Sequence, residues 1–207
     1  MLKKTAPWAG MLGPALFTLS FTLNGQLRPG YSPVRRYISE LSIGPGGWIQ
    51  MLSFIWLGIC LLLFALGLRA FLPEGKAARA APALFSIIGV CYILSGPFVT
   101  DPAAMFDNQQ TLHGTLHGIF GALVFSLSAA VCFVLWRSFA RANRGLLAAF
   151  SLAAGIIMVL LIALMKAGQL QAGILSDWAG VIQRCCLLTS YALIFAVAFR
   201  MRGARGA

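Results

Sequence analysis

Long apolar runs separated by short polar segments dominate this sequence. The runs cover about residues 7–27, 47–71, 82–100, 111–136, 146–168 and 178–199. Each run is close to the roughly 20 residues that an α-helix needs to cross the hydrocarbon core of a bilayer. Apolar residues within a run are continuous rather than alternating, which excludes a membrane β-barrel. The pattern therefore predicts an all-α, polytopic membrane protein with six transmembrane helices in a single domain.

The composition supports a membrane location and argues against a nucleic-acid partner. Hydrophobic residues make up 59% of the 207-residue chain and charged residues only 10%, whereas about a quarter of the residues in a soluble globular protein are charged. The net charge of +11 comes from basic residues scattered over short loops, so it forms no continuous basic face of the kind that binds nucleic acid. The five cysteines lie inside apolar runs without the spacing of metal ligands, and we expect them to be small buried side chains.

The distribution of Lys and Arg over the loops predicts how the helices are oriented. One side of the predicted membrane protein receives Lys3, Lys4, Arg69, Lys76, Arg79, Arg137, Arg141, Arg144, Arg200, Arg202 and Arg205. The other side receives only Arg28, Arg35, Arg36, Lys166 and Arg184. Because cytoplasmic loops carry the excess of basic residues, both termini are expected in the cytoplasm, as an even number of spans requires.

The two histidines of the chain stand together at the start of the fourth apolar run. His113 and His117 are four residues apart, so a helix places them on one face, and Asp101 ends the preceding run at the same predicted outer side. Lys166 and Arg184 lie in the outer parts of the fifth and sixth runs. Ionisable groups at membrane depth are costly unless they face a cavity or the bundle interior. We therefore predict one outward-open polar pocket that these five side chains share.

Simpler interpretations of the same residues remain open. Lys166 and Arg184 have side chains long enough to reach the interface while their stems stay in the apolar layer. His117 could bond a neighbouring carbonyl group without any role in binding or catalysis.

The sequence of the first outer loop, residues 28–46, predicts a short amphipathic helix. Ser32-Pro33 is typical of a helix start and Gly44-Pro45 of a stop. The apolar side of this helix would carry Val34, Tyr37, Ile38 and Leu41, and its polar side Arg35, Arg36, Ser39 and Glu40. Such a helix either anchors the protein in the interface, with Arg36 and Glu40 paired across one turn, or forms a lid that brings Arg35, Arg36 and Glu40 over the pocket.

Three separated motifs occur in order along the chain: Tyr31-Ser32-Pro33 leading to Ile38-Ser39-Glu40-Leu41, then Thr100-Asp101-Pro102, then His113-Gly114-x-x-His117. In these motifs the sequence resembles the domain-of-unknown-function 998 family. The resemblance covers essentially the whole chain and implies a six-helix bundle in a prokaryotic cell membrane. It brings no catalytic assignment. A looser similarity to the membrane hydrolases that include alkaline ceramidases, which bind zinc through histidines, serves as an analogy only.

The histidine pair suggests a metal site. His113 and His117 with Asp101 or Glu40 could supply two nitrogens and a carboxylate to a divalent metal such as zinc, leaving one position open for water. A metal-bound water next to the membrane would hydrolyse a lipid ester, amide or phosphoester. Haem ligation is not expected, because the axial ligands must approach opposite faces of the ring and both histidines lie on one helix.

The outer cations suggest recognition of an anion instead. Arg35, Arg36, Lys166 and Arg184 are candidate ligands of a phosphate-bearing lipid headgroup, since guanidinium groups bind phosphate by paired hydrogen bonds. With His113 or His117 as general acid–base and Asp101 orienting it, the same site would be a lipid phosphatase.

The sequence thus predicts an integral membrane protein that binds a lipid or another amphiphile in an outward-facing pocket and, in the enzyme version, hydrolyses it. The candidate catalytic residues are His113, His117, Asp101, Glu40 and Ser39. The alternatives are a small ion-coupled transporter or sensor, and a structural or assembly protein whose buried polar groups hold helices together. The sequence predicts no oligomeric state.

Overall fold

The computed structural model describes residues 2–102, 110–170 and 173–203, and this part of the chain consists of helices and the turns between them. The long helices are α1 (Leu2–Leu27), α2 (Gly47–Phe71), α3 (Ala77–Ser95), α4 (Leu112–Arg141), α5 (Gly145–Leu170) and α7 (Ala179–Gly203). Two short elements, the 3-10 helix η1 (Ile38–Ser42) and α6 (Ile174–Asp177), lie in the connections. The predicted all-α fold is confirmed.

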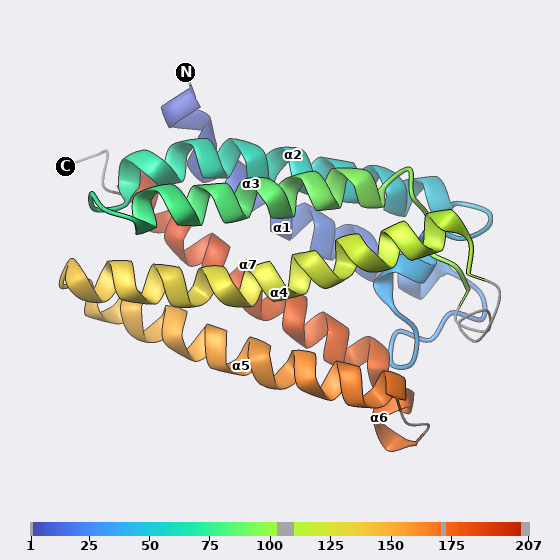
Figure 1. Cartoon of the computed structure of the whole chain (residues 1–207). Coiled ribbons are helices and arrows are strands. Elements are labelled where there is room, and N and C mark those ends of the chain that lie inside the picture. Colours follow the sequence, from blue (N-terminus) through green and yellow to red (C-terminus); the bar gives the residue numbers. More distant parts are fainter. Residues whose placement is uncertain (1, 103–109, 171–172, 204–207) are drawn as a thin grey trace.

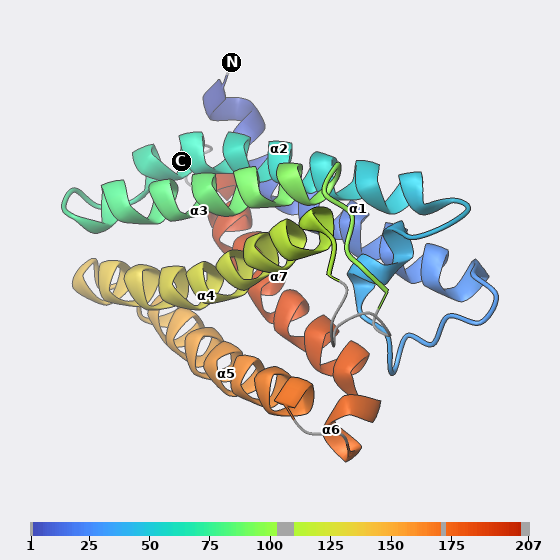
Figure 2. The same cartoon turned by 45° about the vertical axis from the view of Figure 1, so that its right-hand side comes forward.

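The long helices form a ring in chain order. Each packs against the next along the chain, and α7 packs against both α5 and α1, so the ring closes (Figures 1 and 2). Both chain ends lie beside the α2–α3 and α4–α5 turns (Figure 1). We call this the basic end, because it carries Arg69, Lys76, Arg79, Arg137, Arg141, Arg144, Arg200 and Arg202. The opposite end, formed by residues 28–46, 96–102 and 173–178, is the loop end.

Five of these helices, α2, α3, α4, α5 and α7, are long and apolar enough to cross a membrane. This confirms a polytopic membrane protein. α1 has the length, at 26 residues, but its second half contains Thr18, Ser20, Thr22, Asn24 and Gln26, which lower its hydropathy. The sixth span and the cytoplasmic location of the termini therefore stay predictions.

The helix boundaries follow the apolar runs closely, apart from the third. The second predicted span, 47–71, coincides with α2, whereas the third, 82–100, is shifted toward the N-terminus and forms α3. α3 ends at Ser95, just before Gly96-Pro97, because Pro97 has no backbone N–H to donate to the carbonyl group four residues back. Gly58 and Gly89 let α2 and α3 approach closely, since a Cβ on Gly58 would collide with the carbonyl oxygen of Gly89.

Aromatic side chains fill the ring between its middle and the loop end. Phe17 of α1 lies 5.4 Å from Phe54 of α2 and 6.0 Å from both Tyr92 of α3 and Tyr191 of α7, measured between ring centroids. The hydroxyl groups of Tyr92 and Tyr191 are 3.0 Å apart and hydrogen-bonded to each other, so neither is buried without a partner. These aromatic rings fill the space between the helices next to the residues that the sequence predicts to be functional.

Candidate functional site

The first loop is folded onto the start of α7. The backbone N–H of Val181 donates to the carbonyl oxygen of Val34 at 3.1 Å, and the N–H of Ile38 donates to Oε1 of Gln183 at 2.7 Å. Within the loop, helical structure is limited to the 3-10 helix η1, whose Ile38 and Leu41 are buried while Val34 is exposed. The predicted amphipathic helix is thus shorter than expected, because the loop backbone bonds to α7 instead of continuing its own helix.

Arg184 is the main link between this loop and α7. Its Nη1 donates to the carbonyl oxygens of Pro33, at 2.7 Å, and of Arg36 and Gly180, both at 3.0 Å. Its Nη2 donates to the hydroxyl oxygen of Tyr31 at 2.6 Å. Burial raises the pKa of Tyr31, although this hydrogen bond acts in the opposite direction. Arg184 therefore faces the loop rather than reaching out to the interface.

Glu40, which belongs to the same loop, is buried. Its Oε1 accepts a hydrogen bond from the N–H of Tyr37 at 2.9 Å, and its Oε2 lies 3.9 Å from Nη1 of Arg36. Burial raises the pKa of Glu40, while the Tyr37 N–H and Arg36 lower it in part. Ser39 is half-buried, and its carbonyl oxygen accepts from the hydroxyl of Ser42 at 2.6 Å. The predicted pairing of Arg36 with Glu40 across one turn is confirmed.

Arg28, which directly follows α1, donates hydrogen bonds to carbonyl groups in and after η1. Its Nη1 donates to the carbonyl oxygens of Leu41, at 2.8 Å, and Glu40, at 3.3 Å, and its Nη2 donates to that of Pro45 at 2.7 Å. These carbonyl groups lie at or after the end of η1, where a helix leaves its last acceptors unpaired. Arg28 thus satisfies acceptors of the turn that leads into α2.

Asp101 holds the N-terminus of α4. Its Oδ2 accepts from the N–H of Thr111 and its Oδ1 from the hydroxyl of Thr111, both at 2.8 Å. The Thr111 hydroxyl oxygen in turn accepts from the N–H of Gly114 at 3.0 Å, as an N-cap does. A Cβ at Gly114 would collide with the Asp101 carboxylate, so glycine is needed for this close approach. The negative charge also suits the positive end of the helix dipole.

The two histidines share Phe98 as a neighbour but differ in environment. His117 is buried, its Nδ1 lies 2.7 Å from the carbonyl oxygen of Phe98, and its ring meets Phe54 edge-on at 5.8 Å. Because a carbonyl oxygen only accepts, Nδ1 donates, and Nε2 is the acceptor nitrogen of the neutral ring. His113 is exposed, with its ring centroid 5.3 Å from that of Phe98.

Four of the five predicted pocket residues therefore belong to two clusters, and Lys166 belongs to neither. Asp101, His113 and His117 form one at the α3–α4 corner, and Arg36, Glu40 and Arg184 belong to the other at the loop and α7. The aromatic rings of Phe54, Phe17 and Phe21 lie between the two clusters. His117 packs on Phe54, and the guanidinium carbon of Arg184 lies 5.7 Å from the centroid of the Phe21 ring. Lys166 is exposed on α5, and Arg35 forms an exposed ion pair with Asp177 at 3.4 Å.

The predicted metal ligands do not fit a metal ion in this arrangement. Both Asp101 oxygens are used by Thr111, and the His113 ring is exposed beside Phe98. Within residues 2–102, 110–170 and 173–203, no three His, Cys, Asp or Glu side chains are grouped so that they could hold a metal. The predicted zinc site with His113, His117 and Asp101 or Glu40 is thus not assembled, and no hydrolytic step follows from it.

A cavity of about 240 Å³ lies beside the loop cluster. Its lining comes from α1, the first loop and α7 and consists of Thr18, Phe21, Thr22, Gln26, Pro33, Arg184 and Leu188. The three polar residues from α1 were not among the predicted site residues. Their spacing of four residues within an apolar run places them on one helix face, and this was the signal that could have found them.

Comparison with known proteins gives one match. A family model described as "Protein of unknown function (DUF998)" matches residues 11–200, which include both clusters and the cavity. No curated protein and no solved structure matches the chain.

Proposed function

The chain belongs to the DUF998 family, whose description names no reaction, and from that premise we propose that this integral membrane protein binds a membrane lipid or a similar amphiphile in the cavity between α1, the first loop and α7. The observation that carries the proposal is the lining of this cavity. The lining is mostly apolar, with Phe21 and Leu188 as large apolar side chains, and its few polar atoms come from Thr18, Thr22, Gln26 and Arg184. A molecule with a polar head and an apolar tail matches such a lining.

The charge of Arg184 favours a phosphate-bearing head. All four of its hydrogen bonds go to neutral oxygens. The ion pairs of the described residues are Arg35 with Asp177 and Arg36 with Glu40, so no carboxylate neutralises Arg184 there. A half-buried cation next to a cavity attracts an anion, and guanidinium groups are well suited to phosphate.

The proposal is limited to binding. Hydrolysis of a lipid needs a nucleophile or an activated water beside the scissile bond, together with a group that transfers protons. The lining of the cavity contains no His, Asp, Glu, Ser or Cys. The candidate base His117 packs on Phe54, and Phe17 and Phe21 lie between Phe54 and Arg184.

Lipid retention by cavity variants tests this proposal. The purified full chain in mild detergent would be incubated with a fluorescent phosphatidylglycerol, and binding would be measured by polarisation. Thr22→Trp fills the cavity and should lower affinity by at least about tenfold, a loss on the order of 1.4 kcal/mol. Thr189→Trp is the matched control, because Thr189 is also a helical threonine whose hydroxyl donates four residues back, but it is half-buried and does not line the cavity.

A smaller change sharpens the result. Thr22→Val replaces the hydroxyl group with a methyl group of similar size and should weaken binding by about fivefold, as expected for one hydrogen bond, while Thr189→Val should bind like the wild type. If Thr22→Trp retains wild-type affinity, the cavity is not the binding site and the proposal is wrong.

A further inference from the structure

A second and larger cavity lies at the opposite end of the bundle. It has a volume of about 660 Å³ and is lined by Phe71 of α2, Arg144 and the first residues of α5, and Phe199 and Arg200 of α7. We propose that this cavity is a separate site for the phosphate headgroup of an anionic membrane lipid. This inference rests on residues that play no part in the loop-end cavity.

Arg144 provides a buried donor without a partner. Its guanidinium carbon lies 4.5 Å from the centroid of the Phe71 ring, which holds the planar group in place. Its Nη1 is buried and has no hydrogen-bond partner among the described residues. A buried charged donor left unpaired is costly, by more than the 1–3 kcal/mol typical of a neutral group. Phosphate oxygens are the acceptors that would satisfy it.

Arg200 brings a second cation to the same cavity from another helix. It is exposed in the last turn of α7. The lining contains no Asp or Glu, and both ion pairs of the described residues lie at the loop end. The N-terminus of α5 also lines the cavity through Gly145, and the first N–H groups of a helix have no acceptor within it. Two guanidinium groups without a carboxylate therefore line a cavity in which a singly charged phosphodiester would neutralise part of their charge.

The walls favour a lipid over free phosphate. Leu146 and Phe199 line the cavity and are 74% and 56% exposed, so they would contact the glycerol and the first methylene groups of a lipid. Free phosphate would leave these apolar surfaces and most of the volume unused. The cavity also lies where helices of membrane-spanning length end, and basic pockets between such helix ends are typical of anionic lipid sites.

The test measures binding of defined probes to the full chain in detergent. The probes are phosphatidylglycerol, diacylglycerol of the same acyl chains, and inorganic phosphate. We expect diacylglycerol to bind at least about tenfold more weakly than phosphatidylglycerol, and inorganic phosphate at millimolar concentration not to displace the lipid. Equal binding of both lipids would overturn the proposal, and efficient displacement by inorganic phosphate would mean a site for a free anion instead.

Variants assign the binding to this cavity. Arg144→Gln and Arg200→Gln should each lower affinity for phosphatidylglycerol by about tenfold, whereas Arg79→Gln, which removes an exposed cation at the same end but outside the cavity, should bind like the wild type. If Arg144→Gln fails to fold, the exposed Arg200 decides, and equal affinity of Arg200→Gln and Arg79→Gln contradicts the proposal. These measurements are made in the Thr22→Trp background, in which the loop-end cavity is filled, so they report on this cavity alone and stay interpretable if the loop-end site fails.

Discussion

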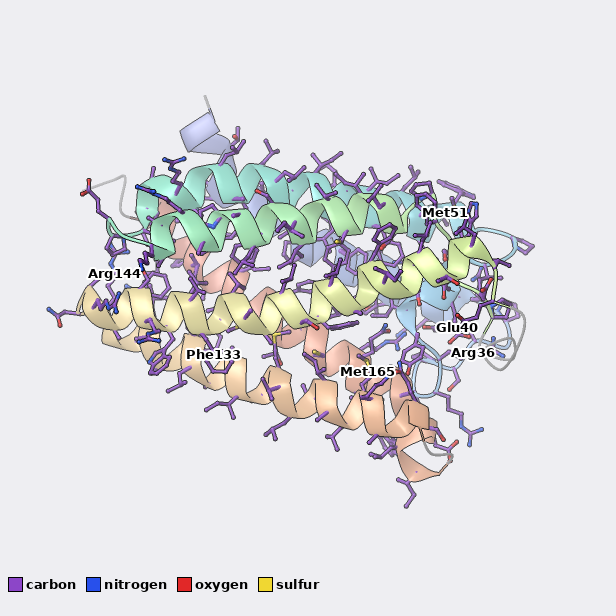
Figure 3. The ribbon with its side chains drawn as sticks, in the orientation of Figure 1. Arg36, Glu40, Met51, Phe133, Arg144 and Met165 are labelled. Atoms are coloured by element: carbon purple, nitrogen blue, oxygen red, sulfur yellow. The ribbon has the colours of Figure 1, made fainter. Side chains whose placement is uncertain are left out.

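The two ends of the bundle use their charged side chains in opposite ways (Figure 3). At the loop end, where Figure 3 labels Arg36 and Glu40, carbonyl oxygens, a tyrosine hydroxyl and carboxylates of the chain itself accept from the arginines. At the basic end, Figure 3 labels Arg144, which packs on an aromatic ring and keeps a buried nitrogen without an acceptor in the described residues. The same residue type thus fastens a loop at one end and is available to an outside anion at the other.

The difference follows from where acceptors are available. The loop end has a long irregular segment, 28–46, whose carbonyl groups are not all used within helices, and arginines from α1 and α7 donate to them. The basic end has short turns between helices, such as residues 142–144, and, within the described residues, no irregular segment of comparable length that folds over its arginines. Cations there must find water, a ring or a ligand. Local charge alone does not reveal which arginines are used within the protein and which are available to a ligand.

The largest expected effect is a loss of stability when the loop end loses Arg184. Arg184→Met removes four hydrogen bonds and leaves the hydroxyl of Tyr31 and the carbonyl of Pro33 without their donor. We expect a loss of about 3 kcal/mol in the free energy of unfolding, since hydrogen bonds to a charged group contribute about 1.5–3 kcal/mol each and do not add fully. Thermal unfolding in detergent and limited proteolysis of residues 28–46 would measure it. Arg200→Met is the control, and equal stability of both variants would contradict the comparison.

A second effect separates two glycines on one helix of the loop end. Gly114→Ala forces a Cβ into the Asp101 carboxylate and should destabilise the protein by about 1–3 kcal/mol. Gly118→Ala meets nothing within 4 Å and should stabilise α4 by about 0.5–1 kcal/mol. Chemical or thermal unfolding of both variants gives the sign of each change. The same sign for both would mean that Asp101 does not hold α4 as described.

A smaller effect is a pH dependence from Glu40. Burial raises its pKa above the ordinary value of 4.5. A carboxyl group with a raised pKa in the folded state stabilises the fold while it is protonated, and this contribution is lost as the pH rises through the folded-state pKa. Relative to Glu40→Gln, which stays neutral and can still accept from the Tyr37 N–H, the wild type should lose stability from about pH 4.5 upward. Unfolding temperatures of both proteins across that range test this, and a constant difference would show that Glu40 does not titrate in the buried site.

The sequence predicted the helices well and the site only in part. Apolar runs define α2, α4, α5 and α7 because membrane depth fixes their length, and the spacing of four residues between Arg36 and Glu40 predicts their contact. Arg184 contacts Pro33 across 151 positions of the chain, a contact that depends on how the ring of helices closes. No local pattern in the sequence contains that information. The depth of each residue along its helix therefore predicted one shared pocket, whereas the structure has two clusters.

The same reasoning explains the missed residues. Arg144 and Arg200 were counted among the cations that orient the protein in the membrane, and orientation is a sufficient reason for them. They line one cavity only because α7 returns between α5 and α1. For Thr22 and Gln26 a signal was present, since polar residues at a spacing of four within an apolar run mark one face.

The shift in unfolding temperature on adding phosphatidylglycerol tests the comparison between the two ends most directly. A ligand that binds the folded state raises the unfolding temperature, and the shift disappears when its site is removed. We predict that, with the loop-end cavity filled by Thr22→Trp, adding the double variant Arg144→Gln/Arg200→Gln removes most of the shift, whereas adding Arg35→Gln/Arg36→Gln, which removes two cations from the loop end, keeps it. A shift that is retained in the first double variant, or lost equally in both, would contradict the account.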